Sequence, residues 1–243
     1  MNKVWLFFRS LVGYMIVGIV FLICSIPCFI IACLPAKWRY DNKVYYWFLN
    51  IFYKGIVWAT FLPITIEGKE NIPDKAAIIV ANHQSSLDIP LLGSLVNSYP
   101  HIWLFLARFA KIPFFGFIVR RMNVVVDHSG LRRLISSLDT AFKIIQKHKS
   151  HVMIFPEGGR YIDNKIHKFL HGFAILAKKT GRPVVPVFMF GVNKVYPPGS
   201  FFVRPHPIHI IVGRSFTFEP DEQEDDFVER VYNWFKQREQ GLK

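Results

Sequence analysis

One long run of apolar residues dominates the N-terminal part of the chain. Leu11 to Leu34 holds no charged residue over 24 positions. At 1.5 Å per residue, such a helix is roughly 36 Å long, enough to cross a hydrocarbon core of about 30 Å. The apolar region of a cleaved signal peptide is only about 7–15 residues, and the same length argues against a lipoprotein processing site at Ile30–Cys33. Basic residues on both flanks leave the orientation of the run open.

A second apolar stretch, Val44–Leu62, is rich in Trp and Tyr and carries Asn50 and Lys54. This composition favours a helix at the membrane interface. The alternative is a second span in which Lys54 reaches toward the surface. Both interpretations predict a membrane-anchoring two-helix segment over residues 1–62 and a separate domain over residues 63–243.

After Pro63 the pattern changes to short apolar runs that alternate with amphipathic segments. The candidate strands are Ile64–Glu67, Ala76–Ala81, Trp103–Ala107, Asn123–Val126, Val152–Phe155, Val184–Phe190 and Ile208–Val212. The candidate helices are Ile89–Asn97, Phe114–Arg121, Leu131–Lys147, Phe169–Thr180 and Gln223–Arg238. Alternation of this kind predicts an α/β fold with a mostly parallel, twisted sheet of about seven strands flanked by helices.

Composition and charge narrow the class of partner. The 243 residues are 51% hydrophobic and carry a net charge of +13, which suits a nucleic acid or an anionic membrane surface. A mean hydropathy of +0.25 favours the membrane, and the sequence contains no recognised nucleic-acid-binding module. The three cysteines all lie in the first apolar run, so a disulfide framework is excluded.

The strongest candidate for chemistry follows the apolar strand that ends at Ala81. The chain continues Asn-His-Gln-Ser-Ser-Leu-Asp, which brings His83 and Asp88 into one short segment. In open α/β sheets the functional crevice lies outside the carboxyl ends of the strands. If the intervening residues begin a helical turn, Asp88 reaches the His83 ring, fixes its tautomer and leaves the other nitrogen free as a base. A simple capped turn has the same spacing.

A second candidate follows the strand Val152–Phe155, where the chain reads Pro-Glu-Gly-Gly-Arg over residues 156–160. This turn presents a carboxylate and a guanidinium at the same predicted edge of the sheet. Arg160 is suited to bind a phosphate with two hydrogen bonds, and the glycines let a ligand approach the backbone. The alternative is an ordinary turn with Arg160 in a surface ion pair.

Taken together, the two motifs resemble the glycerolipid acyltransferase family that includes 1-acylglycerol-3-phosphate acyltransferases. That family carries an Asn-His-x4-Asp box and a Phe-Pro-Glu-Gly-Thr-Arg box. In this chain the boxes stand as Asn82-His83 with Asp88, and as Phe155-Pro156-Glu157-Gly158-Gly159-Arg160. The segment Lys111–Gly116 is similar to the stretch between the family's boxes, and the resemblance covers roughly residues 63–215.

The resemblance implies that His83 is the general base on the acceptor hydroxyl and that Asp88 orients it. It also implies that Glu157, Gly158 and Arg160 help to hold the glycerol-phosphate of the acceptor. The implied reaction moves a fatty acyl group from acyl-CoA or acyl carrier protein to lysophosphatidic acid (1-acyl-glycerol-3-phosphate), which gives phosphatidic acid. The deprotonated hydroxyl attacks the thioester directly, without a covalent enzyme intermediate and without a cofactor. We expect a membrane-bound enzyme, in contact with membrane lipids, whose active site is on the cytoplasmic face.

The chain departs from the family pattern at three positions. Gly159 stands where the family has Thr, His128 where an Arg is common, and His171 where a Lys is common. The departures bear on the phosphate of the acceptor more than on acyl transfer. The acceptor is therefore open between lysophosphatidic acid and another lysolipid, such as a lysophospholipid or an ornithine lipid. A non-catalytic protein that binds acyl lipids is the alternative from a different class.

Other chemistry is less well supported. Ser85 and Ser86 lie beside His83, but the Gly-x-Ser-x-Gly elbow of serine hydrolases is absent. Two closely spaced His pairs lack the Glu of the His-Glu-x-x-His zinc motif, so we expect no metal. These pairs are His167 with His171 and His206 with His209.

Overall fold

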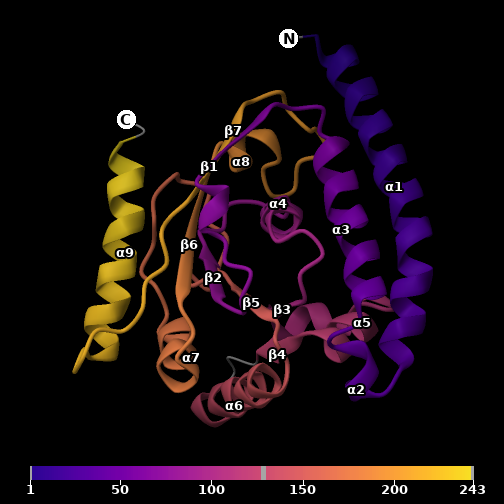
Figure 1. Cartoon of the computed structure of the whole chain (residues 1–243). Coiled ribbons are helices and arrows are strands. Elements are labelled where there is room, and N and C mark those ends of the chain that lie inside the picture. Colours follow the sequence, from indigo (N-terminus) through magenta and orange to yellow (C-terminus); the bar gives the residue numbers. More distant parts are fainter. Residues whose placement is uncertain (1, 127–129, 242–243) are drawn as a thin grey trace.

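The computed structural model describes residues 2–126 and 130–241, and a seven-stranded sheet lies at its centre (Figure 1). The strands are β1 (Ile64–Glu67), β2 (Ile78–Ala81), β3 (His101–Leu106), β4 (Val124–Val126), β5 (His151–Ile154), β6 (Val184–Phe190) and β7 (Ile208–Val212). Their order across the sheet is β1-β7-β6-β2-β5-β3-β4. Neighbouring strands are parallel except for the β6–β7 pair. The predicted fold class is confirmed.

Helices cover both faces of the sheet. On one face, α6 (Leu131–Lys147), α7 (Gly172–Thr180) and α9 (Glu224–Gln240) pack against one buried cluster. On the other face, α4 (Asp88–Leu95) and α8 (Val192–Val195) pack against a second cluster. Side chains of β2 alternate between these two clusters, and because both faces are covered all four of its residues are buried.

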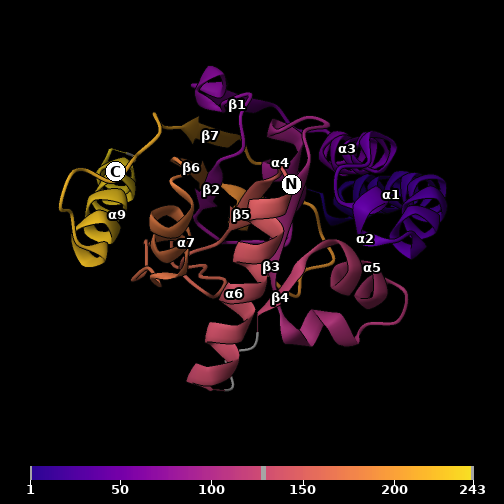
Figure 2. The same ribbon diagram turned by 60° about the horizontal axis from the view of Figure 1, so that its bottom comes forward.

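The remaining elements lie at the margins. They are the helices α1 (Lys3–Cys33), α2 (Ala36–Arg39), α3 (Lys43–Trp58) and α5 (Phe115–Met122), and the short 3₁₀ turns η1 (Lys69–Asn71) and η2 (Ala107–Lys111). Helix α3 packs on α4 on one side and on α1 on the other. Consequently α1 is the outermost layer, on the side of the molecule opposite α9 (Figure 1 and Figure 2).

Polar contacts fasten α1 to the rest of the protein near both of its ends. Near the start, the Arg9 guanidinium donates to the carbonyl oxygens of Val203 (2.6 Å) and Thr60. Near the end, Arg121 of α5 donates from Nε to the carbonyl oxygen of Ala32 at 2.9 Å. Helix α1 therefore lies along the protein over most of its length.

The boundaries agree with the sequence prediction where an apolar run is sharply delimited. The predicted ranges of β1, β6, β7 and α6 match those observed. Helix α7 was expected to begin at Phe169 but begins at Gly172. The reason is a tertiary contact, since the Leu170 N–H donates to the carbonyl oxygen of Pro156 at 2.8 Å and holds this segment outside the helix.

Candidate active site

The site begins where β2 ends, at the buried side chain of Asn82. Its Nδ2 donates to the carbonyl oxygen of Met189 at 2.8 Å, and its Oδ1 accepts the Met189 N–H at 2.7 Å. The amide thus takes the place of a backbone group opposite β6 and satisfies both polar groups of Met189. The strand ends there, and the next residue, His83, leaves the sheet at its carboxyl edge.

His83 and Asp88 are in direct contact, as the spacing predicted. The Nδ1 of His83 lies 2.8 Å from Oδ2 of Asp88, and the exposed fractions of the two side chains are 15% and 0%. Asp88 is the first residue of α4, and its Oδ2 also accepts the backbone N–H groups of Gln84 and Ser85. A carboxylate at Nδ1 fixes the proton on that nitrogen. Within the described residues no group hydrogen-bonds Nε2, so this nitrogen is free to accept a proton.

An aromatic ring supports the imidazole from one side. The ring of Phe155 lies parallel to that of His83, with 4.0 Å between the centroids and 11° between the planes. On its other side Phe155 stacks on Trp103 of β3, at 5.6 Å and 29°. The stack limits tilting of the imidazole and therefore helps to hold Nε2 in one direction.

The carboxylate of Glu157 joins the two sequence motifs. Oε1 accepts the backbone N–H of His83 at 2.9 Å, and Oε2 accepts that of His167 at 3.0 Å. Because both oxygens accept hydrogen bonds from the backbone, the side chain mainly holds the segments of His83 and His167 together beneath the site. Burial raises the pKa of Glu157 to about 7, against the two N–H groups that favour the ionised form.

The glycine turn brings Arg160 to the mouth of the site. Gly158 has φ +68°, a backbone conformation that favours glycine, and an added Cβ would also press on Cδ1 of Leu170 at 2.7 Å. Arg160 is exposed, and its Nη1 donates to the Oγ of Ser86 at 2.8 Å. Ser86 is two residues from Asp88 in the sequence, so the other guanidinium N–H groups are available to an anion beside this segment.

An apolar pocket of about 230 Å³ lies next to this mouth. Its walls come from α1, α3, the start of α4 and the segment after α8. The lining residues are Gly13, Tyr14, Val17, Ile56, Ala59, Thr60, Ser86, Leu87, Pro90, Tyr196 and Val203. Because Ser86 and Leu87 lie between His83 and Asp88 in the sequence, the pocket borders the turn that joins these two residues.

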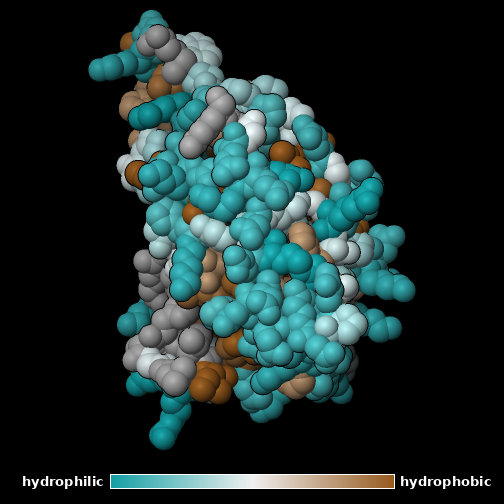
Figure 3. All heavy atoms as spheres, turned by 90° about the vertical axis from the view of Figure 1, so that its left-hand side faces the viewer, coloured by the Kyte–Doolittle hydropathy of each residue, from teal (hydrophilic) through white to brown (hydrophobic). Residues whose placement is uncertain are grey.

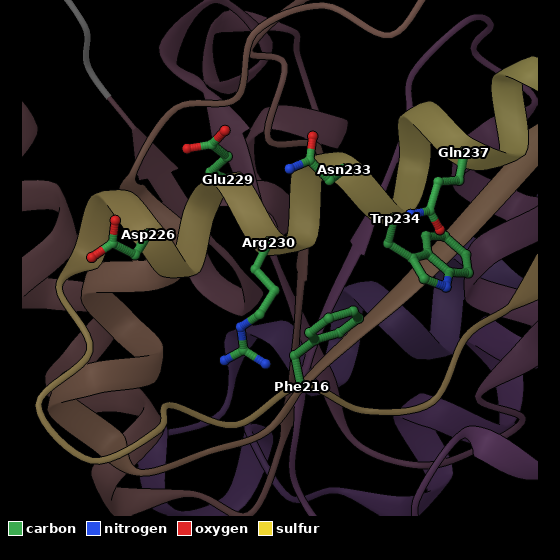
Figure 4. Close-up of a pocket in the computed structure, with 7 residues that line it drawn as sticks. All are labelled: Phe216, Asp226, Glu229, Arg230, Asn233, Trp234 and Gln237. Carbon is green, nitrogen blue, oxygen red and sulfur yellow. The ribbon is translucent and has the colours of Figure 1, made fainter.

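A larger surface depression, about 470 Å³, lies elsewhere, along α9 (Figure 4). It is lined by Phe216, which bridges Val184 at the amino end of β6, and this is the edge of the sheet opposite His83. The side chain of Arg230 lies beside Phe216 in Figure 4 and is paired with Glu222 at 2.7 Å. The depression is remote from His83 and contains no second His–Asp pair.

The other candidate residues from the sequence form contacts within the protein. The hydroxyl of Ser85 donates to the carbonyl oxygen of Tyr196 at 2.6 Å, so it is occupied. His167 pairs with Asp163, and His171 pairs with Asp225. Among the described residues, no group of three or more His, Cys, Asp or Glu side chains is placed to hold a metal. His128 lies outside the described residues.

Three features of the site were not predicted from the sequence. They are the two hydrogen bonds between Asn82 and Met189, the stack of Phe155 on His83, and the hydrogen bonds of Glu157 to the backbone of His83 and His167. The residues themselves lie in the two motifs, but their contacts depend on β2 pairing with β5 and β6, which no local pattern reveals. Only the motif membership of Phe155 signalled its importance.

Comparison with known proteins places these features in a family context. The family model described as Acyltransferase matches residues 63–190. The chain is 34% identical over 171 residues to the 1-acyl-sn-glycerol-3-phosphate acyltransferase BAT2, chloroplastic, of Brassica napus, which covers 69% of this chain and 48% of that protein. It is 26% identical over 200 residues to the 1-acyl-sn-glycerol-3-phosphate acyltransferase of Pseudomonas aeruginosa, which covers 80% and 75%.

Among solved structures, the chain is similar to the 1-acyl-sn-glycerophosphate (LPA) acyltransferase, PlsC, from Thermotoga maritima. The TM-score is 0.81 at 25% sequence identity, and the match covers 100% of this chain and 98% of that one. The chain spans about half the length of the plant relatives that it matches, 48% for the Brassica napus protein and 41% for the LPAT1 protein of Arabidopsis thaliana.

Proposed function

The chain belongs to the Acyltransferase family, and we propose that it transfers a fatty acyl group from a thioester donor to the free hydroxyl of lysophosphatidic acid, which gives phosphatidic acid. The observation that carries this proposal is the contact between His83 and Asp88 at the carboxyl edge of the sheet, with Nε2 unpaired in the described structure. The names of the relatives, which are 1-acyl-sn-glycerol-3-phosphate acyltransferases, support the choice of acceptor.

In the proposed mechanism, Nε2 of His83 takes the proton of the acceptor hydroxyl as its oxygen attacks the thioester carbonyl. The bond from carbon to sulfur then breaks, the ester forms, and the thiolate leaves with the proton returned by the imidazolium. Asp88 carries the negative charge that stabilises the imidazolium, and its two backbone N–H bonds keep it in place. General-base help of this kind contributes about 10²–10⁴ in rate.

Arg160 is proposed to bind the phosphate of the acceptor. It is exposed at the mouth of the site, and its hydrogen bond to Ser86 points the guanidinium toward the catalytic turn. Gly158, which is exposed, lets the headgroup approach the backbone. Glu157 contributes indirectly, since its oxygens are bonded to the backbone of His83 and His167. Gly159 supplies no hydroxyl, so the phosphate relies on the guanidinium.

The apolar pocket beside Ser86 is proposed to receive an acyl chain. Its lining is mostly aliphatic and aromatic, and it includes Ser86 and Leu87, which lie between His83 and Asp88 in the sequence. An apolar chain gains roughly 0.8 kcal/mol for each methylene that it buries. Since the pocket has a fixed volume of about 230 Å³, chains that are too long for it are disfavoured.

We propose that the protein is bound to one leaflet of a membrane through α1. Within the described chain, α1 is the only helix long and apolar enough to cross a bilayer, and only 22% of its most apolar window is buried. Its exposed side chains include Phe8, Met15, Leu22 and Ile26. The opposite face of the molecule, seen in Figure 3, is mostly hydrophilic.

The contacts of α1 favour a helix that lies in the plane of the membrane. Arg9 and Ala32 are both bonded to the catalytic part of the chain, and they are separated by about 35 Å of helix. A transverse helix would put these two contacts on opposite sides of a hydrocarbon core of about 30 Å. Lying flat, α1 keeps both contacts and leaves the site at the surface on the side where soluble acyl donors are found, which we take to be cytoplasmic.

An acceptor screen tests the proposed function. The purified protein in mixed micelles is incubated with a labelled acyl-CoA or acyl-acyl carrier protein and with lysophosphatidic acid, lysophosphatidylcholine or glycerol 3-phosphate. We expect labelled phosphatidic acid with at least one donor, and a rate about 10²–10⁴ lower from the His83→Ala protein. Preference for another lysolipid would change the identity of the acceptor but would still support acyl transfer. No transfer to any acceptor would overturn the proposal.

A further inference from the structure

Tyr53, in the N-terminal helix α3, touches the supports of both members of the His83–Asp88 pair. Its side chain is 5% exposed, although α3 lies outside the sheet and carries two exposed aromatic residues, Trp47 and Trp58. A tyrosine buried so far from solvent needs partners for its hydroxyl. Those partners identify what it does.

The first support is the aromatic stack beneath His83. The indole Nε1 of Trp103 donates to the Tyr53 hydroxyl at 3.0 Å. The same indole stacks on Phe155, which stacks in turn on the imidazole of His83. The Tyr53 hydroxyl therefore fixes the rotation of Trp103, and through Phe155 it limits the tilt of the His83 ring.

The hydroxyl is also fixed from its other side. Nδ1 of His101 lies 2.9 Å from the carbonyl oxygen of Tyr99, so Nδ1 carries the ring proton and Nε2 is the acceptor. Burial lowers the pKa of His101 to about 4, which keeps this imidazole neutral. The Tyr53 O–H then donates to Nε2 of His101 in a long bond of 3.4 Å. Every polar group in this buried chain is satisfied, and the direction of each hydrogen bond is determined.

The second support is the helix that begins with Asp88. Gly93 of α4 packs closely against the Tyr53 ring, and a Cβ at this position would come within 2.3 Å of Cε2 of the ring. Without that glycine the two helices could not approach so closely. Asp88 lies five residues earlier on the same short helix, so a shift of α4 on Tyr53 moves the carboxylate relative to His83.

We propose that Tyr53 is a positioning residue for acyl transfer, one that sets the geometry of His83 and Asp88 by holding the aromatic stack and α4 together. The N-terminal helices are then part of the active-site framework as well as a membrane attachment. This inference rests on the proposed function. It predicts that a change in α3 alters the chemical step while the binding of substrates is largely retained.

Two variants test the proposal from different directions. Tyr53→Phe keeps the ring against Gly93 but leaves Trp103 and His101 without their partner. Gly93→Ala keeps the hydroxyl but forces the ring and α4 apart. Gly18→Ala is the matched control in the N-terminal helices, because an added methyl there meets nothing within 4 Å. For both test variants we expect kcat to fall about tenfold or more, with the KM for donor and acceptor changed less than about threefold.

The magnetic environment of the His83 ring provides a readout that does not require turnover. The Cε1–H signal of His83, assigned by its loss in His83→Ala, is recorded by NMR at one fixed pH in detergent micelles. Because Phe155 stacks on this ring, a tilt between the two rings changes the chemical shift. We expect the chemical shift to change in Tyr53→Phe and Gly93→Ala, and to stay in place in Gly18→Ala. Unchanged kcat and chemical shift in a folded Tyr53→Phe or Gly93→Ala protein would overturn the positioning role. If the wild type transferred no acyl group while these two variants still changed the chemical shift, only the proposed function would be overturned.

Discussion

Replacing Glu157 with Gln removes a buried carboxyl whose pKa burial raises from 4.5 to about 7. An unfolded chain releases this proton near pH 4.5, while the folded protein keeps it up to about pH 7. The stabilisation is therefore fully present below pH 4.5, and the free energy of unfolding falls as the pH rises to about 7. At about 1.36 kcal/mol per pH unit, the whole interval is worth roughly 3 kcal/mol.

The assay is unfolding by urea in detergent micelles, followed by tryptophan fluorescence, across this pH interval for both proteins. Burial lowers the pKa of His101 to about 4 and that of His151 to about 3, so these groups also make stability depend on pH, in the opposite direction. They contribute equally to both proteins. The unfolding free energy of the wild type minus that of Glu157→Gln therefore isolates Glu157, and we expect it to fall by roughly 3 kcal/mol across the interval.

A constant offset is also expected, because the Gln amide accepts at one atom and leaves the N–H of His167 or His83 unpaired. Such a loss costs about 1–3 kcal/mol at every pH. Glu229→Gln, on the exposed surface of α9, controls for the loss of one carboxylate. A difference between wild type and Glu157→Gln that does not vary with pH would refute the reasoning, because Glu157 would then titrate as it does in the unfolded chain.

Three further predictions concern binding. Val17→Phe places a ring in the apolar pocket, and we expect the preferred acyl donor to have a shorter chain. The measurement is kcat/KM over a series of chain lengths. An unchanged preference would show that the acyl chain does not bind in this pocket. Arg160→Ala should raise the KM for lysophosphatidic acid roughly tenfold or more and leave that for the donor in place, since a charged hydrogen bond contributes about 1.5–3 kcal/mol. Phe114, 77% exposed and near Phe29 of α1, should contact lipid, so Phe114→Ser should weaken binding to anionic vesicles about tenfold in a sedimentation assay, whereas Ile135→Ser on α6 should not.

The sequence was sufficient for the fold wherever a local pattern decides the outcome. Strands such as Val184–Phe190 are bounded apolar runs, and α6 is strongly amphipathic, so their limits could be predicted. The start of β3 at His101 was missed because a polar residue begins it. That imidazole is buried with both ring nitrogens hydrogen-bonded, to the Tyr99 carbonyl oxygen and to the Tyr53 hydroxyl. Helix α1 begins before the apolar run. Asn2 caps its first turn, and Arg9 is hydrogen-bonded to the carbonyl oxygen of Val203, far along the chain.

In the site too, some contacts follow from a local sequence pattern and others depend on the pairing of distant strands. The His83–Asp88 contact is local, since Asp88 folds back onto the turn that precedes α4, and so the spacing was informative. The positions of Phe155 and Glu157 relative to His83 depend on β5 lying beside β2, a contact between residues more than 70 positions apart. Spacing carries no information on such pairing, and the pattern that predicted a turn after β5 could not predict what the turn touches.

The most direct test of the mechanism is the turnover of His83→Ala at saturating donor and acceptor, compared with the wild type in the same micelles. A general base at Nε2 predicts a fall in kcat of about 10²–10⁴ with donor binding retained. Turnover that matches the wild type would show that the proton of the acceptor leaves by another route, and the assignment of His83 and Asp88 would be wrong.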